Sequence, residues 1–141
     1  MQMTYDPNNI FAKILAGEIP CHKVYEDDAV LSFMDIMPRS PGHLLVIPKA
    51  PARNLLDIAP DVLTKLILQT QRIAKAAVSV LGADGLTLQQ FSEAAGGQEV
   101  FHIHFHVLPR WEGIRLQSHP APKADMAVLA EQAAKIRAAL G

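Results

Sequence analysis

Apolar residues recur along the chain at the two spacings that distinguish helices from strands. The strongest helical pattern covers residues 60–81, where apolar positions keep three- and four-residue spacing between a proline and a glycine. The same spacing predicts a short helix at 10–16, after Asn8 and Asn9, either of which can cap it. It also predicts a last helix that begins at Asp125.

Five shorter segments carry the apolar, β-branched and aromatic residues that are typical of strands. They are residues 22–26, 29–34, 43–48, 85–91 and 101–108. Asp27 and Asp28 separate the first two segments, which we expect to form a hairpin. The third segment is nearly all apolar, so we expect it near the centre of the sheet. The order of elements predicts an α+β fold, in which an antiparallel sheet of about five strands packs against helices.

Composition narrows the classes to which this chain of 141 residues can belong. It has 13 basic and 14 acidic residues and a net charge of −1, which argues against a protein that binds nucleic acid or acidic lipid. The single Cys21 excludes a disulfide framework within one chain. No apolar run is long enough to span a membrane, and the first residues lack the pattern of a signal peptide. We therefore expect a cytoplasmic protein.

Three of the six histidines share one face of the last predicted strand. His102, His104 and His106 alternate with apolar residues, so their imidazoles should project from one face roughly 6.6–7 Å apart. A face that only meets solvent would carry a mixture of polar residue types. Neighbouring imidazoles also repel one another when they are protonated, so their grouping indicates chemistry.

Two kinds of chemistry fit this histidine face. Two histidines at positions i and i+2 can bind one zinc ion, with Glu93 or Glu99 folding back as a further ligand. Alternatively, a neutral imidazole is a nucleophile toward phosphorus near pH 7. Gly96 and Gly97 precede the strand and would let backbone N–H groups approach a phosphate closely. The residues favour the nucleophile and leave the metal site as the alternative.

The run from Gly97 to Leu108, GQEVFHIHFHVL, resembles the signature of the histidine triad (HIT) superfamily. Four further blocks resemble the family's blocks in the same order. They are IFAKILAGEIP at 10–20, YEDD at 25–28, FMDI at 33–36 and PGHLLVIPK at 41–49. The resemblance covers roughly Ile10 to Trp111 and is closest to the Hint-like branch of nucleoside phosphoramidases and related bacterial proteins. It implies a HIT-like fold in one domain over residues 1–141, with a core at about 8–112 and a C-terminal helical extension at about 123–141.

The resemblance also implies roles for the histidines. HIT proteins bind a purine nucleotide and cleave it at the α-phosphate through a covalent nucleotidyl-histidine. His104 corresponds to the nucleophile, and His106 corresponds to the residue that contacts the phosphate oxygens. His102 and His43 correspond to a supporting hydrogen-bond relay behind the nucleophile. This chemistry needs neither a metal nor another cofactor.

Further positions match residues that hold the nucleotide in the family. Asp35 matches the ribose-binding acid, and a carboxylate can accept hydrogen bonds from both ribose hydroxyls. Gln98 and the N–H groups of Glu99 and Val100 match the phosphate side. The apolar walls around the base correspond to Ile10, Phe11, Ile14, Phe33, Ile36 and Leu45.

Three features depart from the family pattern. Ser92 replaces an asparagine, which shortens the reach of a contact to phosphate or ribose. Glu99 replaces the Ser or Thr that eukaryotic branches carry beside the leaving group, and it would either recognise a cationic leaving amine or point to solvent. Asn9 and Ala12 occupy positions where many bacterial relatives carry a zinc-binding cysteine pair, so that structural zinc is not expected.

The resemblance implies an enzyme that hydrolyses AMP or GMP joined to an amine, an acyl group or another small leaving group. Hydrolysis of dinucleoside polyphosphates, as in the Fhit branch, is a related possibility. A nucleotide-binding interaction protein with weak turnover is an alternative of a different class. We also expect a homodimer formed through the helix at 60–81 and a sheet edge, and no nucleic-acid or membrane partner.

Overall fold

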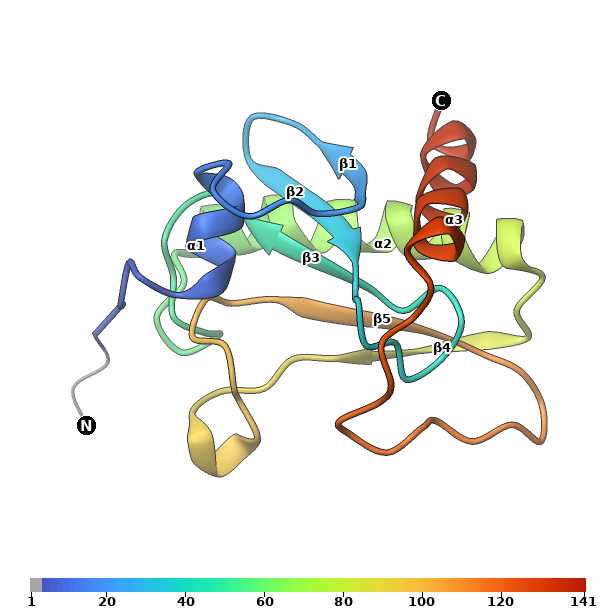
Figure 1. Cartoon of the computed structure of the whole chain (residues 1–141). Coiled ribbons are helices and arrows are strands. Elements are labelled where there is room, and N and C mark those ends of the chain that lie inside the picture. The colour runs from blue at the N-terminus through green and yellow to red at the C-terminus, as the bar shows by residue number, and fades with distance from the viewer. Residues whose placement is uncertain (1–3) are drawn as a thin grey trace.

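The computed structural model describes residues 4–141, and its centre is a five-stranded antiparallel sheet (Figure 1). The strands are β1 (Lys23–Glu26), β2 (Val30–Met34), β3 (Leu44–Pro48), β4 (Gly85–Gln89) and β5 (Phe105–Arg110). They lie in the order β1-β2-β3-β5-β4. The helices are α1 (Ile10–Leu15), α2 (Pro60–Leu81) and α3 (Met126–Ala139), with a short 3-10 turn, η1 (Ala94–Gly96). The α+β prediction is confirmed, and so is the central position of β3.

Helices α1 and α3 begin where the sequence predicts, because side chains there satisfy free backbone N–H groups. The Asn9 side chain accepts a hydrogen bond from the Ala12 N–H at the start of α1, and Asp125 accepts one from Ala127 at the start of α3. Helix α2 ends at Gly82, whose φ of 64° lies in the left-handed region that glycine adopts without strain. No helix of residues 4–141 is both long and apolar enough to cross a membrane.

The predicted histidine strand is shorter than expected. Strand β5 begins at Phe105, so of the three histidines only His106 lies in it. The residues before Phe105 are held by the last residue of β3 and by the loop that follows it, without regular strand pairing. The Ile103 N–H donates to the carbonyl of Ala52 at 2.9 Å, and the His102 ring donates to the carbonyl of Pro48 at 2.8 Å.

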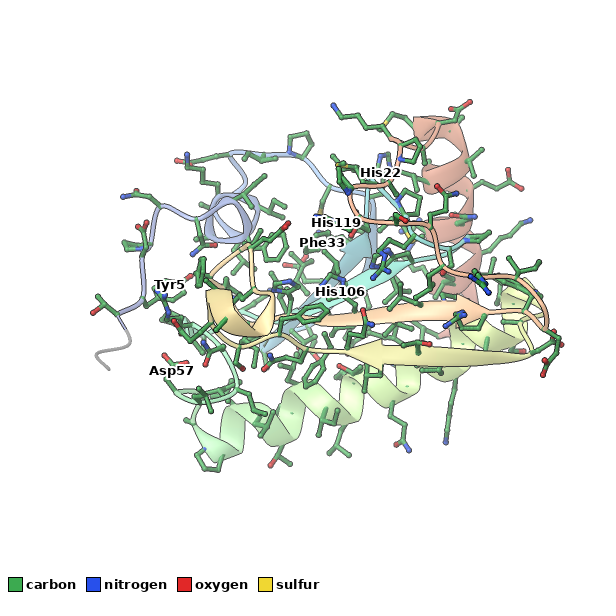
Figure 2. All side chains as sticks on the ribbon, turned by 90° about the horizontal axis from the view of Figure 1, so that it is seen from below. Tyr5, His22, Phe33, Asp57, His106 and His119 are labelled. Carbon is green, nitrogen blue, oxygen red and sulfur yellow. The ribbon has the colours of Figure 1, made fainter. Side chains whose placement is uncertain are left out.

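The two faces of the sheet are covered differently. Figures 1 and 2 show α2 along one face and α1 on the other. Leu44 and Val46 of β3 pack in the larger hydrophobic core beneath α2, whereas Leu45 and Ile47 pack in a smaller cluster with Phe11 of α1. The candidate site lies on the α1 face.

Candidate active site

A cavity of about 400 Å³ opens on the α1 face of the sheet. All six predicted base-side residues line it, namely Ile10, Phe11, Ile14, Phe33, Ile36 and Leu45. Its ionisable side chains are Cys21, Asp35, Arg39, His43, Glu99, His104, His106 and His119. Figure 2 shows Phe33, His106 and His119 together on the side of the sheet opposite α2. A cavity of this size with one polar end suits a small molecule that has both an apolar and a charged part.

His104 is held with one ring nitrogen free. Its Nδ1 lies 2.7 Å from the backbone carbonyl of His102, and because a carbonyl only accepts, Nδ1 must carry the proton. The lone pair is therefore on Nε2. The ring packs edge-on against Phe11 at 4.9 Å between centroids. Burial lowers the pKa of His104 to about 4, so the imidazole is neutral at pH 7 and its Nε2 is a nucleophile.

A second series of hydrogen bonds determines which ring nitrogen carries the proton in His43 and in His106. The Arg39 N–H donates to Nδ1 of His43 at 3.1 Å, so a neutral His43 carries its proton on Nε2. That Nε2 lies 3.0 Å from Nδ1 of His106 and donates to it. His106 then carries its own proton on Nε2. Burial lowers the pKa of His43 to about 4 and that of His106 to about 3, which keeps both rings neutral.

The structure corrects two expectations about the histidines. His43 was expected to form a relay with His102, but it is bonded to His106, because β3 pairs with β5 and Leu45 lies opposite His106. The rings of His104 and His106 are also closer than regular strand geometry predicts, at 4.8 Å between centroids, because His104 precedes the strand.

His102 lies outside the cavity and is completely buried. Its Nε2 donates to the Pro48 carbonyl, which leaves a lone pair on Nδ1. The hydroxyl of Tyr5 lies 2.7 Å from this Nδ1 and donates to it. His102 reaches the cavity only through its backbone carbonyl, which accepts the proton of His104.

Asp35 follows β2 and lines the cavity beside His43. One carboxylate oxygen accepts from the Met37 N–H at 2.8 Å, and the other lies 3.5 Å from Nε2 of His43. Burial raises the pKa of Asp35 above its usual value, opposed by the hydrogen bond from Met37. The free oxygen is an acceptor at the edge of the cavity.

Asp35, His43 and His106 also place one candidate metal ligand each within 4.8 Å of one another. A metal there would need a lone pair on Nε2 of His43. The Arg39 N–H already requires the lone pair on Nδ1, so Nε2 carries the proton and is not free to ligate. The hydrogen bonds therefore fit the neutral imidazole chemistry better than a metal site.

Two predicted phosphate-side residues do not line the cavity. Gln98 is buried, and its amide donates to the carbonyls of Arg53 and Val100 while its oxygen accepts from Asn54. Its side chain thus shapes the loop. Ser92 exchanges hydrogen bonds with the side chain of Gln90. Glu99 and Val100 do line the cavity, as does Gly97.

Among the cavity residues that sequence reasoning missed are Arg39 and His119. The Arg39 Nε donates to the carbonyl of Gln117 at 2.8 Å, and the Gln117 N–H donates to the carbonyl of Arg39 at 2.9 Å. These bonds bring the irregular C-terminal segment over the cavity, where His119 Nε2 lies 2.8 Å from Glu99 Oε2. Neither residue belongs to a periodic pattern, so no local signal marks them.

Comparison with known proteins identifies the family to which this chain is related. The HIT domain model matches residues 16–113, which is more than half of the chain. An uncharacterized HIT-like protein of Methanocaldococcus jannaschii is 42% identical over 104 residues, covering 74% of this chain and 80% of that protein. Adenylylsulfatase HINT3 of Arabidopsis thaliana is 41% identical over 103 residues, covering 73% of this chain and 52% of that protein.

A solved structure is similar over almost the whole chain. It is a Hit-like protein from Bartonella henselae, described as involved in cell-cycle regulation and crystallised with an unknown ligand. The sequence identity is 52% and the TM-score is 0.93, covering 97% of this chain and 99% of that one. The match includes the C-terminal helix as well as the sheet.

Proposed function

The chain belongs to the HIT domain family of nucleotide-binding hydrolases and transferases, and from that premise we propose that it hydrolyses purine nucleotides at the α-phosphate through a covalent bond to His104. The observation that carries the proposal is the state of that residue. His104 is neutral, buried and oriented by the His102 carbonyl, with its free Nε2 at the polar end of an apolar cavity.

In the first step, Nε2 of His104 attacks the α-phosphorus, a P–N bond forms, and the bond to the leaving group breaks. The ring of His104 becomes positively charged, and the His102 carbonyl stabilises this charge through the Nδ1 proton. The Nε2 proton of His106 is available to a phosphate oxygen, where negative charge develops. The leaving amine takes up one proton from solvent as it departs. In the second step, water attacks phosphorus and gives its proton back to solvent, the electron pair of the P–N bond returns to Nε2 of His104, and the nucleoside monophosphate leaves.

The rest of the cavity suits the other parts of a nucleotide. Phe11, Phe33 and Leu45 belong to the small hydrophobic cluster and offer apolar walls to a purine. Asp35 offers a free carboxylate oxygen to the ribose hydroxyls. An AMP or GMP phosphoramidate is the substrate we propose. The relative named adenylylsulfatase supports an adenylate-type substrate.

The leaving group would depart toward the C-terminal segment. Glu99, whose role the sequence leaves open, is hydrogen-bonded to His119, and both side chains are more than half exposed. The pair borders the cavity together with Arg39. We propose that this border selects among leaving groups.

The decisive experiment separates nucleophilic from metal-dependent chemistry. The protein is mixed with an AMP phosphoramidate in excess chelator, quenched rapidly and analysed by mass spectrometry. We expect full activity and one adenylyl group on His104, held by a P–N bond that alkali leaves intact and acid breaks. Activity that chelation removes and zinc restores, with no adduct, would contradict the proposal. Tight AMP binding with negligible turnover would instead favour a nucleotide-binding interaction protein.

We also propose that the chain forms a homodimer. Ile67 and Leu68 of α2 and Leu86 and Leu88 of the edge strand β4 are exposed and line one apolar groove. Pairing of two copies would bury these side chains and cover the sheet edge. Sedimentation should give about twice the chain mass of 15.4 kDa, and Leu68→Glu should give a monomer. A wild-type monomer at micromolar concentration would contradict this proposal.

A further inference from the structure

Tyr5 lies outside the cavity, before the segment that matches the HIT domain model, and yet it contacts the triad. Its hydroxyl donates to Nδ1 of His102 over 2.7 Å. The two rings also pack edge-on, with centroids 5.6 Å apart and planes at 69°. Figure 2 shows Tyr5 on the N-terminal segment, away from His106.

The hydrogen bond from Tyr5 is the first of a series of contacts that leads through His102 to His104. The ring of His102 is held at both nitrogens, by the Tyr5 hydroxyl and by the Pro48 carbonyl. With both ring nitrogens bonded, the residue has no freedom to rotate without leaving a buried polar atom unpaired. Its backbone carbonyl, which orients His104 and selects its tautomer, is therefore fixed in place.

The N-terminal segment is itself anchored beside the triad. One guanidinium nitrogen of Arg53 donates to the carbonyl of Thr4 at 2.9 Å. The same guanidinium lies 4.3 Å from the centre of the Phe101 ring and is paired with Glu93 at 2.7 Å. Phe101 directly precedes His102, so Arg53 joins the segment that carries Tyr5 to the segment that carries the triad.

We propose that Tyr5 is a positioning residue, which acts through His102 to hold His104 in the tautomer and orientation required for attack. This inference rests on the proposed function, because its consequence for turnover requires His104 to be the nucleophile. It adds a residue outside the matched family segment to the machinery of the site. Tyr5 does not touch the cavity, so substrate binding should not depend on its hydroxyl.

The test compares Tyr5→Phe with Tyr25→Phe. Each variant removes one hydroxyl and keeps the ring, and Tyr25 donates to Asp27, away from the cavity. We expect Tyr5→Phe to lower kcat about 3- to 10-fold, as the loss of one buried hydrogen bond would. KM and the Kd for AMP should change less than about twofold, because uniform binding is retained. Tyr25→Phe should leave kcat and KM unchanged.

A double-mutant cycle shows whether Tyr5 acts through His102. In a His102→Ala background, Tyr5→Phe should have no further effect on kcat, since the acceptor is gone. An equal effect in both backgrounds would overturn the proposal. A lowered Tm with unchanged kcat would also overturn it, because Tyr5 would then act on stability alone.

A measurement without turnover keeps this inference separate from the proposed function. Nitrogen-15 NMR of the histidines in the free protein should show His102 protonated on Nε2, with an Nδ1 resonance that shifts in Tyr5→Phe and not in Tyr25→Phe. An unshifted His102 signal would overturn the inference even if the wild type forms the His104 adduct. A shifted signal with no adduct would contradict only the proposed function.

Discussion

On β3 and β5, successive residues point to opposite faces of the sheet, and the two faces have different covers. Val46 and Val107 point to the side of α2, a helix of 22 residues, and are completely buried in the main core. Leu45 and His106 are cross-strand partners on the other side, where α1 has only 6 residues. A short helix cannot cover that face, and the uncovered part is the cavity.

The comparison shows that the two faces of the sheet have different roles. The α2 face stabilises the fold, and the α1 face carries the candidate site. Beneath α2 the side chains are almost entirely apolar, and their burial stabilises the fold without specific polar contacts. On the α1 face, the buried imidazoles are neutral and each has a defined hydrogen-bond partner. Their burial costs stability, and it also produces the free, neutral Nε2 of His104.

The largest expected effect is on the α1 face. His104→Ala removes the proposed nucleophile and should reduce turnover on the order of 10⁴-fold or more. AMP should still bind, because the proposed base and ribose contacts involve other residues, and the Tm should change little. Steady-state kinetics and AMP titration by calorimetry test both. Turnover within tenfold of the wild type would contradict the assigned role.

The matched change on the α2 face is Leu66→Ala. Leu66 is completely buried in the main core, so its truncation should lower the free energy of unfolding by about 2–5 kcal/mol. The turnover of the folded protein should stay within about twofold of the wild type. Urea unfolding and kinetics at a temperature where the variant is fully folded measure the two quantities. A loss of turnover comparable to that of His104→Ala would show that the α2 face also takes part in the chemistry.

The neutral histidines should make stability depend on pH. The pKa values of His43 and His104 are about 4 and that of His106 about 3, below 6.5 in the unfolded chain. Below pH 6.5 the unfolded chain therefore binds more protons, and the free energy of unfolding falls as the pH falls. The slope is up to about 1.4 kcal/mol per pH unit for each histidine.

The contribution of a single histidine can be isolated with His106→Asn. Because His106 is held neutral in the folded protein, this variant should lower the slope of the free energy of unfolding against pH, between pH 5 and 6.5, by up to about 1.4 kcal/mol per pH unit. Urea unfolding at several pH values measures the slope. A wild-type slope of zero over this range would show that the site histidines are not held neutral.

A smaller effect is expected at the cavity border. His119 and Glu99 form an exposed side-chain contact, and exposed contacts of this kind contribute at most about 1 kcal/mol. His119→Ala should therefore change the ratio of kcat/KM for a bulky and a small amine leaving group by about 2- to 5-fold. AMP affinity should stay within about twofold. An unchanged ratio would show that the C-terminal segment does not select the leaving group.

The smallest expected effect is that of Ser92→Asn, which restores the residue typical of the family. Ser92 does not line the cavity and is bonded to Gln90. We therefore expect kcat/KM to change less than about twofold. A larger gain would show that an asparagine at this position reaches the nucleotide, as the resemblance implies for other members.

The sequence alone determined the secondary-structure elements and the family. Helix periodicity, capping by Asn9 and Asp125 and the apolar run of β3 are local properties, and the structure confirms the elements that they predict. The histidine motif is also local, and the match to the HIT domain confirms the family that it indicates. Short-range patterns were sufficient here because each depends on residues a few positions apart.

Only the tertiary structure decided how the histidines are arranged and protonated. The partner of His43 depends on the register between β3 and β5, and the proton on His102 depends on a carbonyl 54 residues away and on Tyr5, 97 residues away. His119 reaches the cavity because the loop around Arg39 bonds to a segment 78 residues later. Such contacts produce no periodic pattern in the sequence, because a hydrogen bond requires only that two groups lie close together. It does not constrain the residues of the chain between them.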